Sequence, residues 1–111
     1  LLIARALSDG ALGELLAAAR GLEMAALVEI HDERELERAL AAGADLVGIN
    51  NRSFADFTVD LSVADRLLPL VPPGMAAVVE GGISGPEDVS RFARAASDPE
   101  SAVRALAEAL G

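Results

Sequence analysis

Short apolar runs alternate along the chain with longer segments in which apolar residues recur at helical spacing. The short runs predict β-strands, and the longer segments predict amphipathic helices. The predicted strands are Leu1–Leu7, Ala25–Ile30, Ala44–Asn50 and Met75–Glu80. The predicted helices are Ala11–Arg20, Glu33–Ala42, Leu61–Leu70, Glu87–Ala95 and Glu100–Leu110.

Residues that commonly begin or end helices lie at these boundaries. A short acceptor side chain satisfies free N–H groups of the first turn, and a Glu three residues later completes a capping box. The start signals are Asp32 with Glu35, Asp60, Ser84 with Glu87, Pro86, and Asp98 with Pro99. Gly43 and Gly74 occupy positions typical of the glycine that ends a helix.

This alternation predicts an α/β fold in which helices cover a parallel sheet of about four strands. Two folds share the series, the open doubly wound sheet and the closed (β/α)8 barrel, and periodicity does not separate them. In both folds ligands bind where the strands end. One strand is missing from the series, because the chain passes from the helix ending at Ala95 through Ser97 directly into the last predicted helix.

The chain has 111 residues, about half of the ~250 that a complete barrel usually needs. It begins at Leu1, inside an apolar run that is typical of a buried strand. We therefore expect residues 1–111 to form a single C-terminal half-barrel fragment of a longer protein.

Charge and composition exclude several kinds of function. The formal net charge is −9, with nine Arg and no Lys, and the aromatic residues are three Phe. Such a chain lacks the cationic contacts and stacking surfaces that bind nucleic acids. The absence of cysteine excludes disulfides and thiolate metal sites and favours a reducing cytoplasm. No apolar run is long enough for a membrane span, so we expect a cytoplasmic protein.

Glu29 lies at the end of the second predicted strand. Side chains alternate along a strand, so Glu29 shares a face with Leu27 and His31 and is expected among apolar neighbours. Burial disfavours the charged form of a carboxyl group and suits it to general-base chemistry. The alternative is a solvated Glu paired with an Arg. Asp32 and Glu35 are explained as a helix cap, which leaves His31 without convergent partners, and no metal site or cofactor is predicted.

The next two strand ends also carry polar groups. The segment Asn50–Arg52 places two carboxamides and a guanidinium at a strand terminus, where they can orient a substrate hydroxyl and bind an anion. A turn with a solvent-facing Arg is the alternative. Glu80 is followed by Gly81 and Gly82 just before a helix, where glycines let a phosphate approach the free N–H groups, although a plain turn has the same pattern.

Four segments carry a more specific signal: Leu27–Asp32, Gly43–Arg52, Val59–Leu61 and Glu80–Ile83. In this order they resemble the fifth to seventh strand regions of the indole-3-glycerol phosphate synthase family. The string from Gly48 to Arg52 (Gly-Ile-Asn-Asn-Arg), followed by Val-Asp-Leu, is the most specific part. The resemblance covers nearly the whole chain and implies a partial (β/α)8 TIM barrel.

The resemblance also implies an activity and roles for particular residues. The family is a carboxy-lyase of tryptophan biosynthesis that closes and decarboxylates 1-(2-carboxyphenylamino)-1-deoxyribulose 5-phosphate, and no cofactor is implied. By position, Glu29 matches the general base, and Asn50 and Glu80 match polar catalytic groups. The residues implied to bind the phosphorylated substrate are Arg52, Gly81 and Gly82.

Three departures from the family pattern bear on activity. Gly81 stands where the family commonly has Ser. The eighth strand and its phosphate loop are missing after Ala95, as though about a dozen residues had been dropped. The family's catalytic lysines, including the general acid, belong to the N-terminal half, and this chain has no Lys. Because losing one member of an acid–base pair lowers the rate by ~10² to 10⁴, we expect the chain to be inactive alone.

Two other hypotheses remain open. The chain is a non-catalytic half-barrel used for assembly or interaction, or it belongs to another phosphate-binding barrel such as phosphoribosylanthranilate isomerase. The Asn50-Asn51-Arg52 string argues against membership of another phosphate-binding barrel family. A half-barrel exposes two sheet edges, so we expect self-association or pairing with a missing N-terminal half.

Overall fold

The computed structural model describes residues 1–96. The helix expected at Glu100–Leu110, its start at Asp98 and Pro99, and the junction that enters it at Ser97 lie outside the described residues.

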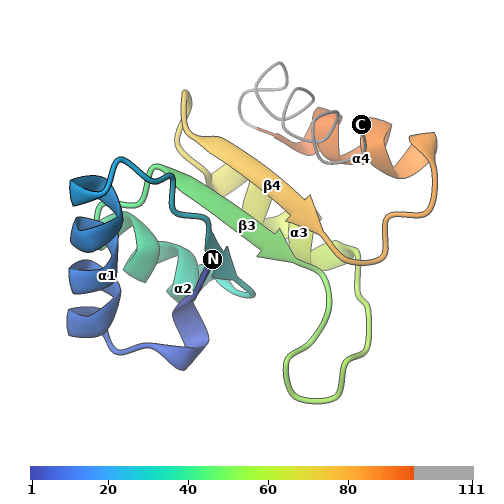
Figure 1. Cartoon of the computed structure of the whole chain (residues 1–111). Helices are drawn as coiled ribbons and strands as arrows, with labels where there is room; N and C mark the ends of the chain where they lie inside the picture. The colour runs from blue at the N-terminus through green and yellow to red at the C-terminus, as the bar shows by residue number, and fades with distance from the viewer. Residues whose placement is uncertain (97–111) are drawn as a thin grey trace.

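Four strands and four α-helices alternate along the described residues, with two short 3-10 helices between them (Figure 1). In chain order they are β1 (Leu2–Ile3), η1 (Ala4–Ala6), α1 (Asp9–Gly21), β2 (Val28–Ile30), α2 (Glu33–Ala41), β3 (Leu46–Asn50), α3 (Ser62–Leu67), η2 (Leu68–Leu70), β4 (Ala76–Glu80) and α4 (Pro86–Ala95). Among these residues no helix has the length and apolar character needed to cross a membrane.

All four strands are parallel, and they pair in the order β1-β2-β3-β4. A doubly wound sheet reverses its strand order at a switch point, whereas a barrel adds each strand beside the previous one. Periodicity alone was compatible with both folds, and the sequential strand order favours the barrel. The described residues form part of such a barrel.

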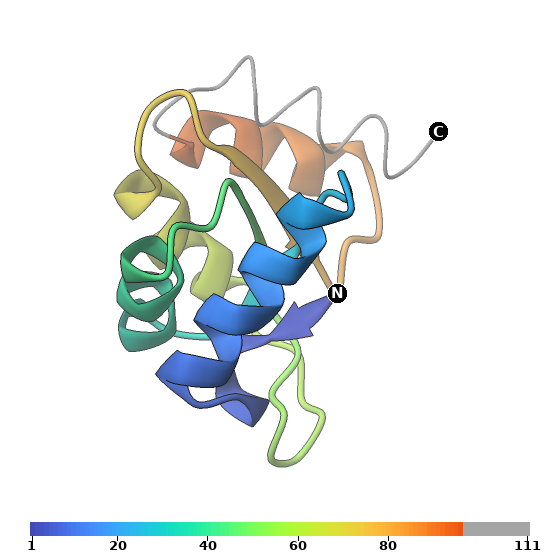
Figure 2. The ribbon, with the colours of Figure 1, turned by 60° about the vertical axis from the view of Figure 1, so that its left-hand side comes forward.

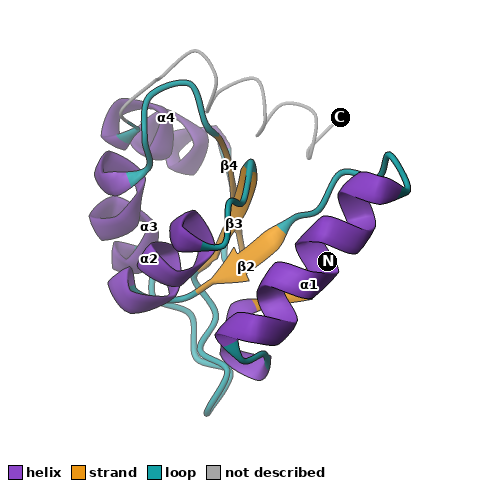
Figure 3. Ribbon diagram, turned by 90° about the vertical axis from the view of Figure 1, so that its left-hand side faces the viewer, coloured by secondary structure: helices purple, strands orange, loops and turns teal. Residues whose placement is uncertain are grey.

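The two faces of the sheet differ in burial. Val28, Val47 and Ala77 are neighbours in register, as are Ile30, Ile49 and Val79, and all six side chains are buried. The helices cover this face through buried apolar residues, and in Figure 3 α2, α3 and α4 lie together on one side of the strands. These residues are Leu12 and Leu16 of α1, Leu36 and Ala39 of α2, Ala64 and Leu67 of α3, and Phe92 of α4. The opposite face is the inner face of the partial barrel, where Leu46 and Val78 are only half-buried.

The first strand is much shorter than the expected Leu1–Leu7. It ends at Ile3, and the chain then turns through η1, where the N–H of Leu7 donates to the Ala4 carbonyl at 3.2 Å. Arg38 of α2 holds this turn by donating to the carbonyls of Ala4 and Leu7. The prediction of a long first strand is wrong because these long-range hydrogen bonds to a helix override the apolar pattern.

The other strands were correctly predicted but extend over fewer residues, starting at Val28, Leu46 and Ala76. Two helix boundaries differ for identifiable reasons. The first helix starts at Asp9 rather than Ala11, because the Ser8 hydroxyl accepts from the Ala11 N–H at 3.1 Å. The third α-helix ends at Leu67 and tightens into η2, because Pro69 has no N–H to continue it.

The capping predictions were partly correct. The Asp32 side chain accepts from the Glu35 N–H at 2.8 Å and caps α2. The capping box at Ser84 and Glu87 is wrong, since Gly85 is the N-cap of α4 and Ser84 instead donates to Asp88.

The two glycines expected at helix ends both have left-handed backbones. Gly43 follows α2 with φ of 85°, as expected. Gly74 has the same φ but lies in a turn before β4, where the N–H of Met75 donates to the Pro72 carbonyl at 3.1 Å, and not at a helix end.

The loop from Asn51 to Leu61 projects away from the body of the molecule in both Figure 1 and Figure 2. Arg52 and Val59 pair antiparallel at its base, and the N–H of Ser53 donates to the Thr58 carbonyl at 2.8 Å. The loop is therefore a short hairpin that extends directly from the end of β3. Its position places it beside the strand ends where a ligand is expected.

Candidate active site

Three polar side chains converge on the inner face where β2, β3 and β4 end. Asn50 and Glu80 are partners in the β3–β4 register, and Glu29 pairs with Gly48 across β2 and β3. The Asn50 carboxamide donates to Glu29 Oε1 at 3.3 Å. The structure thus brings Glu29, Asn50 and Glu80 together, as the strand-end rule predicts for ligand-binding residues.

Gly48 makes room for this cluster. A Cβ atom at this position would lie 2.3 Å from Glu80 Oε1, closer than any real contact of this kind. The absence of a side chain on β3 therefore lets the carboxylate of β4 fold across the strand towards Glu29. Gly48 belongs to the Gly-Ile-Asn-Asn-Arg string, but the string alone does not predict this role for it.

The electrostatic environment of Glu80 favours its neutral form. Burial raises the pKa of Glu80, the negative charge of Glu29 raises the pKa further, and the proximity of His31 partly offsets both effects. Within residues 1–96, two buried side-chain atoms have no hydrogen-bond partner, Glu80 Oε1 and His31 Nε2. Unsatisfied buried polar atoms are rare, and both belong to this cluster, which makes it the candidate position for a substrate group or a water molecule.

Glu29 has polar neighbours on the inner face, Asn50 and Glu80, while the apolar side chain of Leu27 lies against its register partner Gly48. One expectation about the end of β2 is wrong. His31 does have convergent partners, since Nδ1 lies 3.2 Å from Glu35 Oε2 and Nε2 lies 3.7 Å from Glu29 Oε2. Among the described residues, no set of three or more His, Cys, Asp or Glu side chains is arranged to hold a metal ion.

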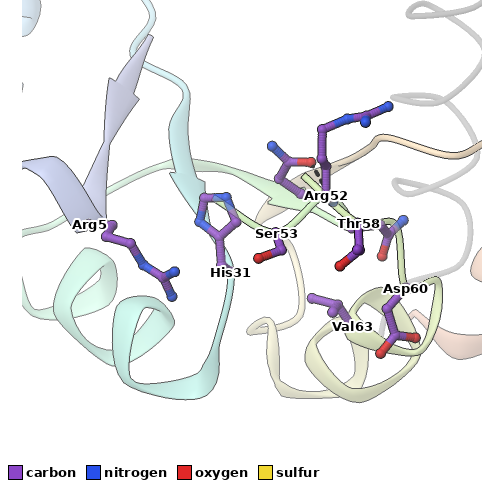
Figure 4. A pocket seen from close by; sticks show the side chains of 9 residues that line it. Arg5, His31, Arg52, Ser53, Thr58, Asp60 and Val63 are labelled. Atoms are coloured by element: carbon purple, nitrogen blue, oxygen red, sulfur yellow. Dashed lines mark hydrogen bonds between the residues drawn. The ribbon is translucent and has the colours of Figure 1, made fainter. Parts of the chain in front are cut away.

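A cavity of about 240 Å³ opens beside this cluster (Figure 4). In Figure 4 Arg5 and His31 line one side, and Ser53, Thr58 and Asp60 line the other. Asn50 also lines the cavity and connects it to Glu29. Arg5 was missed by sequence reasoning, because it was assigned to a strand rather than to the turn that brings it here.

The two asparagines after β3 have different roles. Asn51 is almost fully buried, donates to the Gly81 carbonyl at 3.1 Å and accepts from the Ala64 N–H at 3.0 Å, so it joins β4 to the start of α3. Its carboxamide is therefore structural. Asn50 faces the inner side, and of the two it is the one available to a substrate.

Arg52 is exposed and belongs to the hairpin. Its N–H donates to Asn50 Oδ1 at 2.9 Å, and its guanidinium donates to the Phe57 carbonyl at 3.0 Å. Phe57 has a φ of 61°, an uncommon conformation for a large side chain that directs this carbonyl. Arg52 is among the residues that line the cavity, but in Figure 4 its side chain points away from the other labelled side chains.

Gly81 and Gly82 follow β4 with left-handed φ values of 80° and 76°. A Cβ atom at Gly81 would lie 3.0 Å from Asn50 Oδ1, and one at Gly82 would lie 2.3 Å from the Val59 side chain. Glycine is thus required here for close packing against β3 and the hairpin. At the start of α4, Asp88 accepts from both the N–H and the hydroxyl of Ser84, so this amide is used within the protein.

Comparison with known sequences shows the family of the chain. The sequence model described as indole-3-glycerol phosphate synthase matches residues 1–99. The chain belongs to the indole-3-glycerol phosphate synthase family. The family expectation and the partial-barrel fold are therefore confirmed.

Several relatives named indole-3-glycerol phosphate synthase are similar to most of the chain. The protein from Nocardioides sp. is 44% identical over 119 residues, covering 96% of this chain and 46% of the relative. The protein from Campylobacter jejuni is 46% identical and covers 78% of this chain and 34% of the relative. The protein from Parafrankia sp. is 47% identical and covers 88% of this chain and 37% of the relative. The chain therefore spans less than half of the length of these relatives.

Proposed function

We propose that this chain supplies the C-terminal half of an indole-3-glycerol phosphate synthase active site. The supporting observation is the convergence of Glu29, Asn50 and Glu80 at three adjacent strand ends, with two unpartnered buried polar atoms aimed into the cluster. The reaction is ring closure and decarboxylation of 1-(2-carboxyphenylamino)-1-deoxyribulose 5-phosphate, followed by loss of water. This activity belongs to the tryptophan pathway that the family serves.

The geometry suggests complementary roles for the two carboxyl groups. Glu29 accepts a hydrogen bond from Asn50 and acts as the general base. Burial and the charge of Glu29 raise the pKa of Glu80, so Glu80 holds a proton more readily and is suited to donation. Asn50 orients the substrate between them.

The remaining predicted residues bind the phosphorylated substrate. Arg52 is among the residues that line the cavity, and its exposed guanidinium is suited to an anionic group of the substrate. Gly81 and Gly82 have backbones that bring main-chain amides close to the strand ends, which favours a phosphate contact. The Ser84 amide already donates to Asp88, so the glycines are the better candidates.

We further propose that the chain is inactive alone. It has no Lys to act as the general acid and spans less than half of its relatives. The Nocardioides match extends over 119 residues, more than the 111 in this chain, so the relative has residues inside the matched region that this chain lacks. Such a difference is what the loss of an internal strand would produce.

The test combines the full chain with a chimera. Residues 1–96 replace the matching segment of the Nocardioides enzyme, whose N-terminal half and eighth strand are retained. We expect no indole-3-glycerol phosphate from the full chain and clear turnover from the chimera. Glu29→Gln in the chimera should lower kcat by at least ~10²-fold, because it removes the general base.

Glu37→Gln is the matched control, since Glu37 is an exposed residue of α2 and the substitution changes the charge equally. It should leave turnover near that of the parent chimera. A folded chimera without activity, or one indifferent to Glu29→Gln, would contradict the proposed function.

A further inference from the structure

Arg5, Glu35, His31 and Glu29 form a continuous line of polar contacts from the edge of the partial barrel to the cluster. Arg5 donates to Glu35 Oε1 at 2.7 Å, and Glu35 Oε2 accepts from the His31 backbone N–H at 2.6 Å. The same oxygen lies 3.2 Å from His31 Nδ1. His31 Nε2 then faces Glu29 Oε2 at 3.7 Å.

Three of the four members of this line are buried. The side chains of His31, Glu35 and Glu29 are all more than nine-tenths buried. The edge of the Phe54 ring meets the imidazole at a centroid distance of 6.0 Å and an interplanar angle of 76°. The imidazole therefore has little freedom to rotate away from the two carboxylates.

The contacts of Glu35 determine which ring nitrogen carries the proton. An ionised carboxylate only accepts hydrogen bonds, and the other oxygen of Glu35 is paired with the Arg5 guanidinium. The nitrogen next to it, Nδ1, is then the protonated one in the neutral ring. Nε2 is then left with a lone pair on the side of Glu29, and it has no hydrogen-bond partner among the described residues.

We propose that His31 is the positioning and proton-accepting partner of Glu29, and that Glu35 and Arg5 fix its tautomer. When Glu29 has taken a proton from the substrate, its carboxyl group donates that proton to Nε2. Glu29 is thereby ionised again, and the imidazolium carries one proton on each nitrogen between two carboxylates. The separation of 3.7 Å must shorten for this transfer, as catalytic hydrogen bonds commonly do when substrate binds.

Other charged groups surround the ring. Glu80 from β4 interacts electrostatically with both His31 and Glu29, and Arg5 lines the same cavity. Asn50 from β3 holds the second oxygen of Glu29, Oε1, which leaves Oε2 to face the imidazole. The two oxygens of Glu29 thus have separate partners, one fixed and one able to exchange a proton.

The proposal depends on the proposed function only for its chemical role, and the tautomer is testable on the full chain. His31 is the single histidine, so long-range ¹H–¹⁵N correlation spectra of the ¹⁵N-labelled chain report its ring without assignment. At about pH 8 we expect the neutral ring to carry its proton on Nδ1. Glu35→Gln should shift the ring towards the Nε2-protonated form, and the exposed Glu37→Gln should not.

A ring protonated on Nε2 in the parent chain, or a spectrum unchanged by Glu35→Gln in a folded variant, would overturn the proposal. Amide spectra of each variant show whether it folds, and Glu35→Asp provides a second variant that keeps a carboxylate. In the active chimera, His31→Gln should lower kcat at least tenfold with KM within about twofold. An inactive chimera contradicts the proposed function, whereas the wrong tautomer contradicts the role of His31.

Discussion

The partly buried carboxyl group of Glu80 destabilises the folded chain at neutral pH. Its pKa is raised in the folded chain, first by burial and then by the charge of Glu29. The folded state therefore binds a proton at a pH where the unfolded chain has released it. Stability falls as pH rises from about the ordinary value of 4.5 through the raised pKa of the folded state.

Glu80→Gln removes this penalty. We expect the variant to unfold at a higher urea concentration than the parent at neutral pH, and the difference to shrink towards acid pH, where Glu80 is protonated in both states. Urea unfolding at a series of pH values measures this. Glu37→Gln changes the net charge of −9 by the same amount from an exposed site and serves as the control. An equal gain from Glu80→Gln at all pH values would contradict the prediction.

At the scale of single elements, α1 depends on the cap that starts it. The Ser8 hydroxyl satisfies the Ala11 N–H, one of the free donors of the first turn. Ser8→Ala should therefore lower the free energy of unfolding by about 1 kcal/mol, whereas Ser8→Asp, which keeps an acceptor, should change it by only a few tenths. Urea denaturation followed by circular dichroism compares the two variants. Equal losses in both would show that the hydroxyl acceptor is not what stabilises the helix start.

The same local rules explain what the sequence could predict. Helical spacing and the signals at Asp32 and Gly43 are local, so the described helices and the strands β2, β3 and β4 were predictable. The short β1 was not, because the turn after it depends on hydrogen bonds from Arg38, which lies far along the chain. Local signals therefore predict that an element exists, but they do not predict an end that is set by a contact with a distant part of the chain.

The site shows the same division. The strand-end rule predicted that Glu29, Asn50 and Glu80 lie close together, since it needs only the boundaries of the strands. The partner of His31 was missed because Glu35 was assigned wholly to the helix cap. The backbone N–H of Glu35 does donate to the Asp32 cap, but the Glu35 carboxylate takes no part in the cap and contacts the imidazole. Gly48 was missed because its role depends on a side chain from the neighbouring strand.

For the whole molecule, the inner face and the sheet edges determine behaviour in solution. Within the described sheet, β1 and β4 each pair on one side only. The inner face leaves Leu46 and Val78 half-buried, and Leu22 and Met24 beyond α1 are largely exposed. A closed barrel has no free edges and fills its interior with side chains, so both features favour association in this chain.

We therefore expect the 111-residue chain not to sediment as a compact monomer. The net charge of −9 opposes association, but its repulsion is screened beyond ~8 Å at physiological ionic strength, whereas apolar contact at the inner face is not weakened by salt. Raising the salt concentration should consequently shift the population towards dimers or larger assemblies. Sedimentation velocity at micromolar concentration, repeated at low and high salt with a dye that binds exposed apolar surface, measures this. A compact monomer at both salt concentrations, without dye binding, would mean that the open inner face does not govern the behaviour of the chain in solution.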